Sequence, residues 1–75
     1  MIMNKEEFKT KFNELRDKQS IIFIYINNSV YYSAYIICDD FQFLSANDDK
    51  NKGIVLFKKD SMIACINIDD IIRIY

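Results

Sequence analysis

The groups best suited to chemistry in this chain are three pairs of adjacent aspartates. Hard cations such as magnesium bind carboxylate oxygens, so each pair is a candidate metal site. Two neighbouring turn residues seldom direct both carboxylates at one ion, however, and the spacing differs from that of a calcium-binding loop. Aspartate also favours turns because its carboxylate accepts hydrogen bonds from nearby backbone N–H groups. We interpret the pairs as turn residues and expect neither a metal ion nor another cofactor; they are Asp39-Asp40, Asp48-Asp49 and Asp69-Asp70.

The two cysteines are potential nucleophiles, and the chain contains no histidine. A thiol or hydroxyl becomes an effective nucleophile when a neighbouring base accepts its proton or a nearby cation lowers its pKa. Histidine, the usual base at neutral pH, is absent, and no lysine or arginine lies near Cys38 in the sequence. We therefore predict that the protein is not an enzyme. Cys38 and Cys65 are interpreted as reduced core thiols of a cytoplasmic protein.

Tyrosine and phenylalanine are concentrated in one part of the sequence. Exposed aromatic rings can stack on nucleic-acid bases. In a core or a protein interface, tyrosine instead packs its ring and finds a partner for its hydroxyl. No lysine or arginine is interleaved with these rings, which favours the core or the interface over base stacking. The cluster comprises Tyr25, Tyr31, Tyr32, Tyr35, Phe41 and Phe43.

Length and charge limit the classes of protein to which the chain can belong. Seventy-five residues make one domain, residues 1–75, and the formal net charge is −1. A domain that depends on phosphate contacts usually has a basic excess, which is missing here. No stretch approaches the roughly 20 apolar residues that span a bilayer, so no membrane association is expected. Because a core this small gives marginal stability, we expect homo-oligomerisation to contribute.

An amphipathic helix is predicted for residues 4–18. Asn4 can cap its first turn, and Glu7 completes a capping-box pattern. Met3 and Phe8 have the spacing of a hydrophobic staple. The helix has a single apolar stripe and must dock on the rest of the chain; the stripe consists of Phe8, Phe12 and Leu15.

A long run without lysine or arginine follows, from residue 20 to residue 46. Its first part, residues 20–26, lacks polar alternation and is typical of a strand covered on both faces. Asn27-Asn28 and Asp39-Asp40 are predicted tight turns. We expect a strongly bent antiparallel meander, with an exposed loop at residues 47–53 and strands at 20–26, 29–38, 41–46, 54–58, 62–66 and 71–75.

This order of elements resembles that of the Sm-like family, which includes the Lsm proteins and bacterial Hfq. The likeness is closest from residue 21 to residue 44, where the sequence Ile37-Cys38-Asp39-Asp40-Phe41-Gln42-Phe43 ends a pattern similar to the family's first motif. Residues 66–74 resemble the second motif. Ser33 replaces a family glycine, and Asn67-Ile68 stands where the family has Arg-Gly or Lys-His. The resemblance implies a mainly β fold: an N-terminal helix (4–18) and a small five-stranded, strongly bent antiparallel barrel (20–75) of Sm-like or SH3-like type.

The resemblance also implies a homo-oligomer that binds single-stranded RNA as a regulator. The apolar stretches 63–66 and 71–75 are the expected edge strands, because an unpaired apolar edge invites another strand. Phe41 would contact the ligand, and basic side chains would contact phosphate. The residues implied in RNA binding are Asp39, Asp40, Phe41, Lys58, Lys59, Asn67 and Arg73.

Two other functions remain open on the sequence alone. One is a protein-interaction module, a small regulator or inhibitor that acts through its aromatic sheet or an edge strand and binds no nucleic acid. The other is a small barrel whose only partner is another copy of itself.

Overall fold

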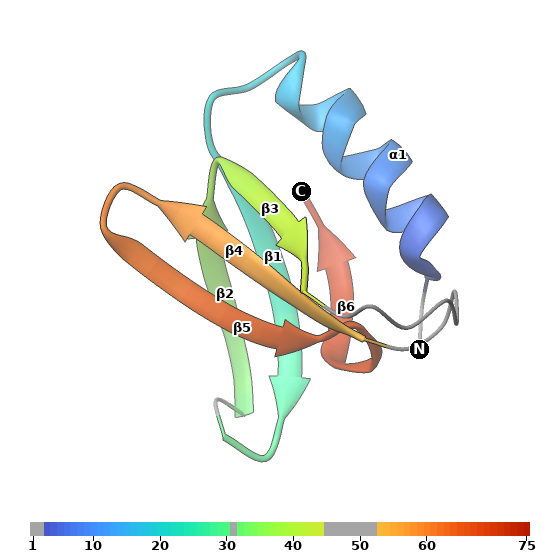
Figure 1. Cartoon of the computed structure of the whole chain (residues 1–75), viewed down its shortest axis with the longest axis vertical. Coiled ribbons are helices and arrows are strands. Elements are labelled where there is room, and N and C mark those ends of the chain that lie inside the picture. The colour runs from blue at the N-terminus through green and yellow to red at the C-terminus, as the bar shows by residue number, and fades with distance from the viewer. Residues whose placement is uncertain (1–2, 31, 45–52) are drawn as a thin grey trace.

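The computed structural model describes residues 3–30, 32–44 and 53–75. As predicted, the fold is mainly β with one N-terminal helix (Figure 1). No helix in these three ranges is long and apolar enough to cross a membrane. Tyr31, Asp48-Asp49 and most of the loop predicted at 47–53 lie outside the described residues. The elements are α1 (Lys5–Arg16), β1 (Ile22–Asn28), β2 (Tyr32–Cys38), β3 (Asp40–Phe43), β4 (Ile54–Lys59), β5 (Met62–Asn67), the 3-10 helix η1 (Ile68–Asp70) and β6 (Ile71–Ile74).

Helix α1 begins as the sequence predicts. The Glu7 backbone N–H donates to Asn4 Oδ1 at 2.9 Å, and the Asn4 backbone N–H donates to Glu7 Oε1 at 3.3 Å, which completes the capping box. The helix ends two residues earlier than predicted because the N–H groups of Lys18 and Gln19 both bond to the Leu15 carbonyl, at 3.0 and 2.9 Å. Phe8 and Phe12 of the apolar stripe are buried, and their rings contact that of Phe41 in β3, so the stripe packs against the sheets.

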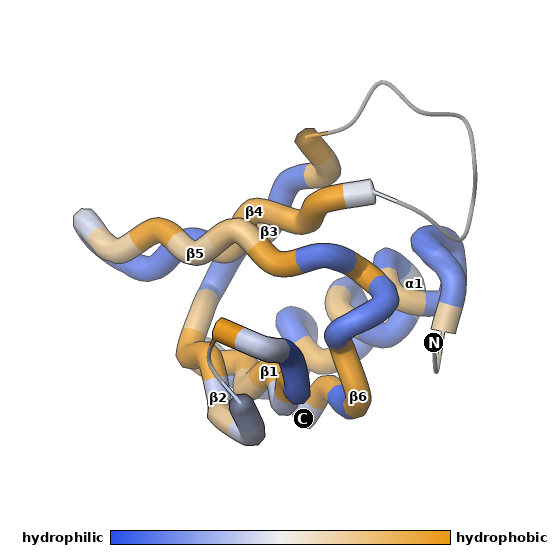
Figure 2. Tube along the Cα trace, turned by 90° about the horizontal axis from the view of Figure 1, so that it is seen from below, coloured by the Kyte–Doolittle hydropathy of each residue, from blue (hydrophilic) through white to orange (hydrophobic). Residues whose placement is uncertain are grey.

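The strands form two three-stranded antiparallel sheets. Their orders are β2-β1-β6 and β3-β4-β5. Figure 2 shows the sheets as two layers, with α1 beside them at one end. The core lies between the layers and under the helix; its buried members are Phe8, Phe12, Ile22, Ile24, Ile26, Cys38, Val55, Phe57, Ile66, Ile68, Ile71 and Ile74.

The prediction of a tight turn at Asp39-Asp40 is wrong. Cys38 still pairs with Ile22 of β1, but the next N–H group, that of Asp39, donates to the Lys58 carbonyl of β4 at 3.0 Å. The chain bends at this point and passes from one sheet to the other, so β2 and β3 have different partners and do not pair with each other. A closed five-stranded barrel is not confirmed, because the described residues form six strands in two separate sheets.

Strand β1 corrects two further predictions. It is covered on one face only: Ile24 is fully buried, whereas Phe23 is 40% exposed. The turn predicted at Asn27-Asn28 is also wrong, because both residues belong to β1 and Asn28 pairs with Tyr32. The Asn28 side chain instead accepts a hydrogen bond from the backbone N–H two residues later, at 3.0 Å, and starts the turn beyond the strand.

Candidate functional site

The bend between β2 and β3 contains three of the residues implied in RNA binding. Arg16, at the end of α1, forms an ion pair with Asp40, with Nη2 and Oδ1 2.5 Å apart, and also donates to the Asp39 carbonyl at 3.3 Å. Asp40 Oδ1 accepts a second hydrogen bond from the Phe41 backbone N–H at 2.9 Å. The hydrogen bond from Arg16 is the main reason that the pKa of Asp40 lies below its usual value. These contacts connect the C-terminal end of α1 to the bend between β2 and β3.

The third residue, Phe41, is half-buried under the helix. Its ring centroid lies 4.6 Å from that of Phe12, 5.1 Å from that of Phe8 and 5.3 Å from that of Phe43. The edge-on contacts with Phe8 and Phe43 are arrangements that aromatic quadrupoles favour. Phe41 thus has a packing role, and its contact with RNA stays a prediction.

The remaining implied residues are dispersed. Lys58 is exposed and pairs with Asp40 across β3 and β4, which brings it to the bend. Lys59 forms an ion pair with Asp60 at 3.9 Å. Asn67 pairs with Ile54 at the other end of β4, where its side chain accepts the Asp69 N–H at 3.1 Å and caps η1. Arg73 lies in the other sheet, so the structure assembles only part of the predicted set.

A second group of residues lies on the outer face of the β2-β1-β6 sheet. Tyr25 pairs with Tyr35 on one side and with Arg73 on the other, which puts the three side chains on the same face. Phe23 and Tyr75 exchange backbone hydrogen bonds of 3.1 and 2.9 Å and extend this row. We call Phe23, Tyr25, Tyr35, Arg73 and Tyr75 the tyrosine face.

The rings of the tyrosine face contact one another. Tyr35 is central, with ring centroids 5.0 Å from Tyr25, 6.1 Å from Tyr75 and 6.5 Å from Phe23. Desolvation by these neighbours, and then the nearby Tyr75 hydroxyl, raise the pKa of the Tyr35 phenol, while the charge of Arg73 acts in the opposite direction. Sequence reasoning did not place Arg73 and Tyr75 in this cluster because they lie far along the chain from Tyr25 and Tyr35 and reach them only through the pairing of β6 with β1.

An apolar groove of about 390 Å³ lies between β2 and the β4-β5 hairpin. One wall is the edge strand β5, where Met62 is 71% and Ile63 64% exposed. Within the described chain, four strands lie at an end of their sheet and have a hydrogen-bonded strand on one side only: β2, β3, β5 and β6. The groove is lined by Ala34, Tyr35, Ile36, Ile37, Phe57, Lys59, Met62, Ile63 and Ala64.

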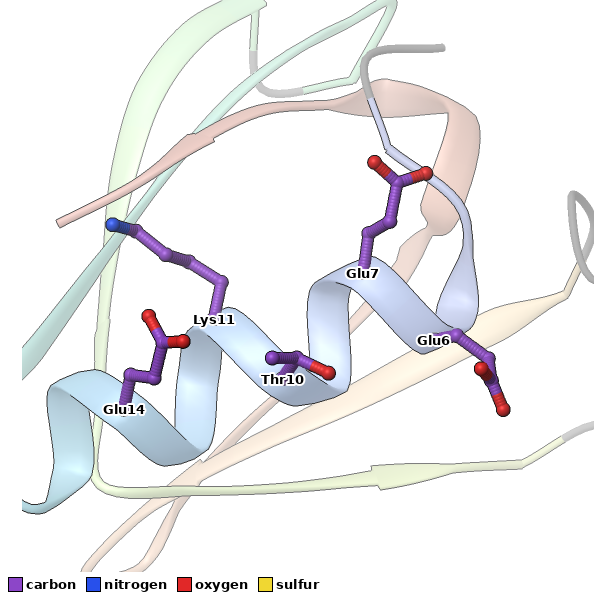
Figure 3. Close-up of a pocket in the computed structure, with 5 residues that line it drawn as sticks. All are labelled: Glu6, Glu7, Thr10, Lys11 and Glu14. Atoms are coloured by element: carbon purple, nitrogen blue, oxygen red, sulfur yellow. The ribbon is translucent and has the colours of Figure 1, made fainter.

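The outer surface of α1 carries an open, charged hollow of about 370 Å³. Figure 3 shows its side chains along the helix, with Glu6 and Glu7 extending in different directions rather than toward a common point. Among the residues that the structure describes, no three His, Cys, Asp or Glu side chains come together as a metal site. The hollow is a solvated helix surface; its lining residues are Glu6, Glu7, Thr10, Lys11 and Glu14.

The two cysteines have different environments. Cys38 is buried, as predicted, and its desolvation, followed by the nearby Asp39 charge, raises the pKa of its thiol to about 12. A thiol with so high a pKa remains protonated at neutral pH and is a poor nucleophile. The prediction of a buried thiol is wrong for Cys65, which is exposed because its side chain points away from the core face of β5.

Comparison of the chain with protein-family models, with curated proteins and with solved structures gives no match. The features of the structure that bear on function are the tyrosine face, the exposed edge of β5 and the groove beside it.

Proposed function

We propose that the protein is an oligomer-forming small β domain of Sm-like design that assembles through its edge strands. The order of the strands supports this proposal. If β2 and β3 are counted as one strand bent at Asp39, the order β6-β1-β2/β3-β4-β5 is that of a five-stranded, partly open barrel. The two ends of this order are β5 and β6.

The observation that carries the proposal is the exposed edge of β5. The strand has six residues, none of them charged, and Met62, Ile63 and Cys65 are exposed along it. Proteins usually protect such an edge with charges, proline or a cover, because it is a template for another strand. Pairing of β5 with β6 of another copy is a head-to-tail contact, which closes a ring when the rotation between copies permits.

The test is the mass of the protein in solution, measured by light scattering during size-exclusion chromatography. We expect a mass several times that of one chain. Ile63→Lys places a charge on the β5 edge and should shift the mass toward the monomer. Val30→Lys is the matched control, since Val30 is 71% exposed and lies in a turn rather than on an edge strand. A wild-type monomer, or equal effects of both variants, would contradict the proposal.

A second candidate function, a protein-interaction module, is favoured by the apolar groove beside β5. An extended segment of another protein that pairs with an edge strand gains main-chain hydrogen bonds, and adjacent pockets accept its side chains. The groove has this position relative to β5. The two functions predict different masses in solution. The first predicts an oligomer of the chain alone. A protein-interaction module would be a monomer without its partner and would bind that partner through the β5 edge.

A further inference from the structure

The groove between β2 and the β4-β5 hairpin is an open continuation of the core. Phe57 pairs with Ala64, and Lys59 pairs with Met62, so these four side chains lie on one face of the hairpin. That face is the core face, because Phe57 is 1% exposed. The hairpin projects beyond β2 (Figure 1 and Figure 2), and its inner face is therefore covered at Phe57 but open at Met62, which is 71% exposed.

Strand β2 supplies the opposite wall of the groove from its own core face. Ala34 and Ile36 lie on the same face of the strand as the buried Cys38. Both are half-buried and pack against the edge of the core. The two walls enclose about 390 Å³, within the range of roughly 300–1,000 Å³ that is typical of small-molecule sites. The strands therefore leave an apolar space of ligand size beside the core.

A single charged residue, Lys59, lines this groove. Its pairing with Met62 is the last before the hairpin turn, which places it at the outer end of the groove, whereas Phe57 lies two residues further toward the core. Asp60 is its ion-pair partner, but the two charged atoms are 3.9 Å apart and the Asp60 side chain is 85% exposed, so this ion pair contributes little. The groove thus has an apolar inner part and a positive charge at its mouth.

We infer that this groove binds a free fatty acid, with the acyl chain along Ile36, Phe57 and Ala64 and the carboxylate beside the Lys59 ammonium. An acyl chain buries apolar surface without bringing polar groups into the groove, and its ionised carboxylate complements the one cation. The inference does not depend on assembly through β5 and β6.

The hydrogen-bonding groups of the lining favour a fatty acid over a polypeptide. A polypeptide in this space would bring an N–H and a C=O with every residue, and unpaired polar groups are costly to bury. Among the lining side chains, those of Tyr35 and Lys59 have O–H or N–H groups that could pair with them. An extended peptide would therefore have to pair with the outer edge of β5 and insert side chains alone.

An apolar site of this kind predicts how affinity depends on the length of the acyl chain. Each methylene group transferred from water to the groove should tighten binding about fourfold. Affinity should therefore rise about 15-fold from octanoate to decanoate, and again from decanoate to dodecanoate, until the chain is longer than the groove. A carboxylate held by its charge alone would show no such dependence.

The experiment is isothermal titration calorimetry of the full chain with octanoate, decanoate, dodecanoate and 1-decanol, each below its micelle or solubility limit. Lys59→Gln should weaken decanoate binding about 2- to 5-fold and leave 1-decanol binding unchanged. Lys58→Gln is the matched control, because Lys58 lies on the other face of β4. Asp60→Asn should tighten decanoate binding, since it removes the negative charge beside Lys59; the φ of Asp60 is 55°, which asparagine also tolerates.

A second pair of variants tests the position of the acyl chain. Ala64→Leu fills the inner part of the groove and should weaken dodecanoate binding about 10-fold or more, because the added side chain takes the space of two or three methylene groups. Cys65→Leu is the control, since Cys65 is exposed on the opposite face of β5. Far-ultraviolet circular dichroism checks that both variants are folded, and the Lys59 and Asp60 variants test the site at the hairpin tip without altering the core.

Absence of saturable dodecanoate binding would overturn the inference, as would equal affinities for octanoate and dodecanoate or equal effects of Lys59→Gln and Lys58→Gln. If a labelled peptide of alternating isoleucine and serine binds the protein, and dodecanoate neither binds nor displaces it, the groove accepts a polypeptide instead. Solution mass separates this test from that of assembly. A monomer that binds dodecanoate supports the inference and contradicts assembly, and an oligomer that does not bind it has the opposite meaning.

Discussion

Removal of the Phe41 ring distinguishes a packing role from a ligand role for this residue. Truncation of a buried phenylalanine to alanine destabilises a protein by about 3–5 kcal/mol. Phe41 is half-buried but contacts three other rings, with centroid distances of 4.6 to 5.3 Å. We therefore expect Phe41→Ala to lower the free energy of unfolding by about 2–3 kcal/mol. A domain of 75 residues has about 4–11 kcal/mol in total, so the variant should remain folded.

The assay is urea denaturation followed by far-ultraviolet circular dichroism, with Phe23→Ala as the matched control. Phe23 is also a strand phenylalanine, but it is 40% exposed and its ring contact is with Tyr35 at 6.5 Å. Its truncation should have a smaller effect on stability. If Phe41→Ala is no more destabilising than Phe23→Ala, the packing role that we infer for Phe41 under α1 is wrong. If folded Phe41→Ala loses binding to single-stranded oligouridylate that wild type and Phe23→Ala both show, the ligand role implied by the Sm-like resemblance is correct.

Two further predictions concern titratable groups. Asp40→Asn should lower the unfolding free energy at neutral pH by less than about 1 kcal/mol, because the Arg16–Asp40 ion pair is solvent-accessible. Because the pKa of Asp40 is lowered, its ionised carboxylate stabilises the fold at pH values above the ordinary aspartate pKa, and this contribution disappears as the pH falls through the lowered pKa. The urea unfolding curves of wild type and Asp40→Asn should therefore converge in acid. A difference that persists in acid would contradict this prediction. A thiol reagent should modify Cys65 in the native protein but Cys38 only after unfolding, because the Cys38 thiol is buried and its pKa is raised. Mass spectrometry counts the modified cysteines. Equal rates of modification of the two cysteines in the native protein would refute this prediction.

Features set by local interactions were predictable from the sequence. The capping box of Asn4 and Glu7, and the apolar stripe that buries Phe8 and Phe12, depend on residues within a few positions of each other. The hairpin between β4 and β5 was also predicted within one residue at each end. In each case the local pattern and the tertiary packing favour the same conformation.

The bend at Asp39 could not be predicted in this way. Two adjacent aspartates indicate a turn, but whether the chain reverses or changes sheets depends on which strand offers the next hydrogen-bond partner. Here the Lys58 carbonyl, from a strand that comes later in the sequence, accepts the Asp39 N–H, and Arg16 from the helix fixes Asp40. Non-local contacts therefore decide the conformation.

The uncovered face of β1 follows from the size of the chain. A run without lysine or arginine from residue 20 to 46 suggested a strand covered on both sides, yet a chain of 75 residues has one layer of elements to place over each sheet. The second sheet and α1 cover Ile24, and in the described chain nothing is left to cover Tyr35. The outward positions of β1 and β2 nevertheless include phenylalanine and tyrosine and no charged residue. Because exposed aromatic groups on a small domain often mark interaction sites, the tyrosine face is a candidate interaction surface.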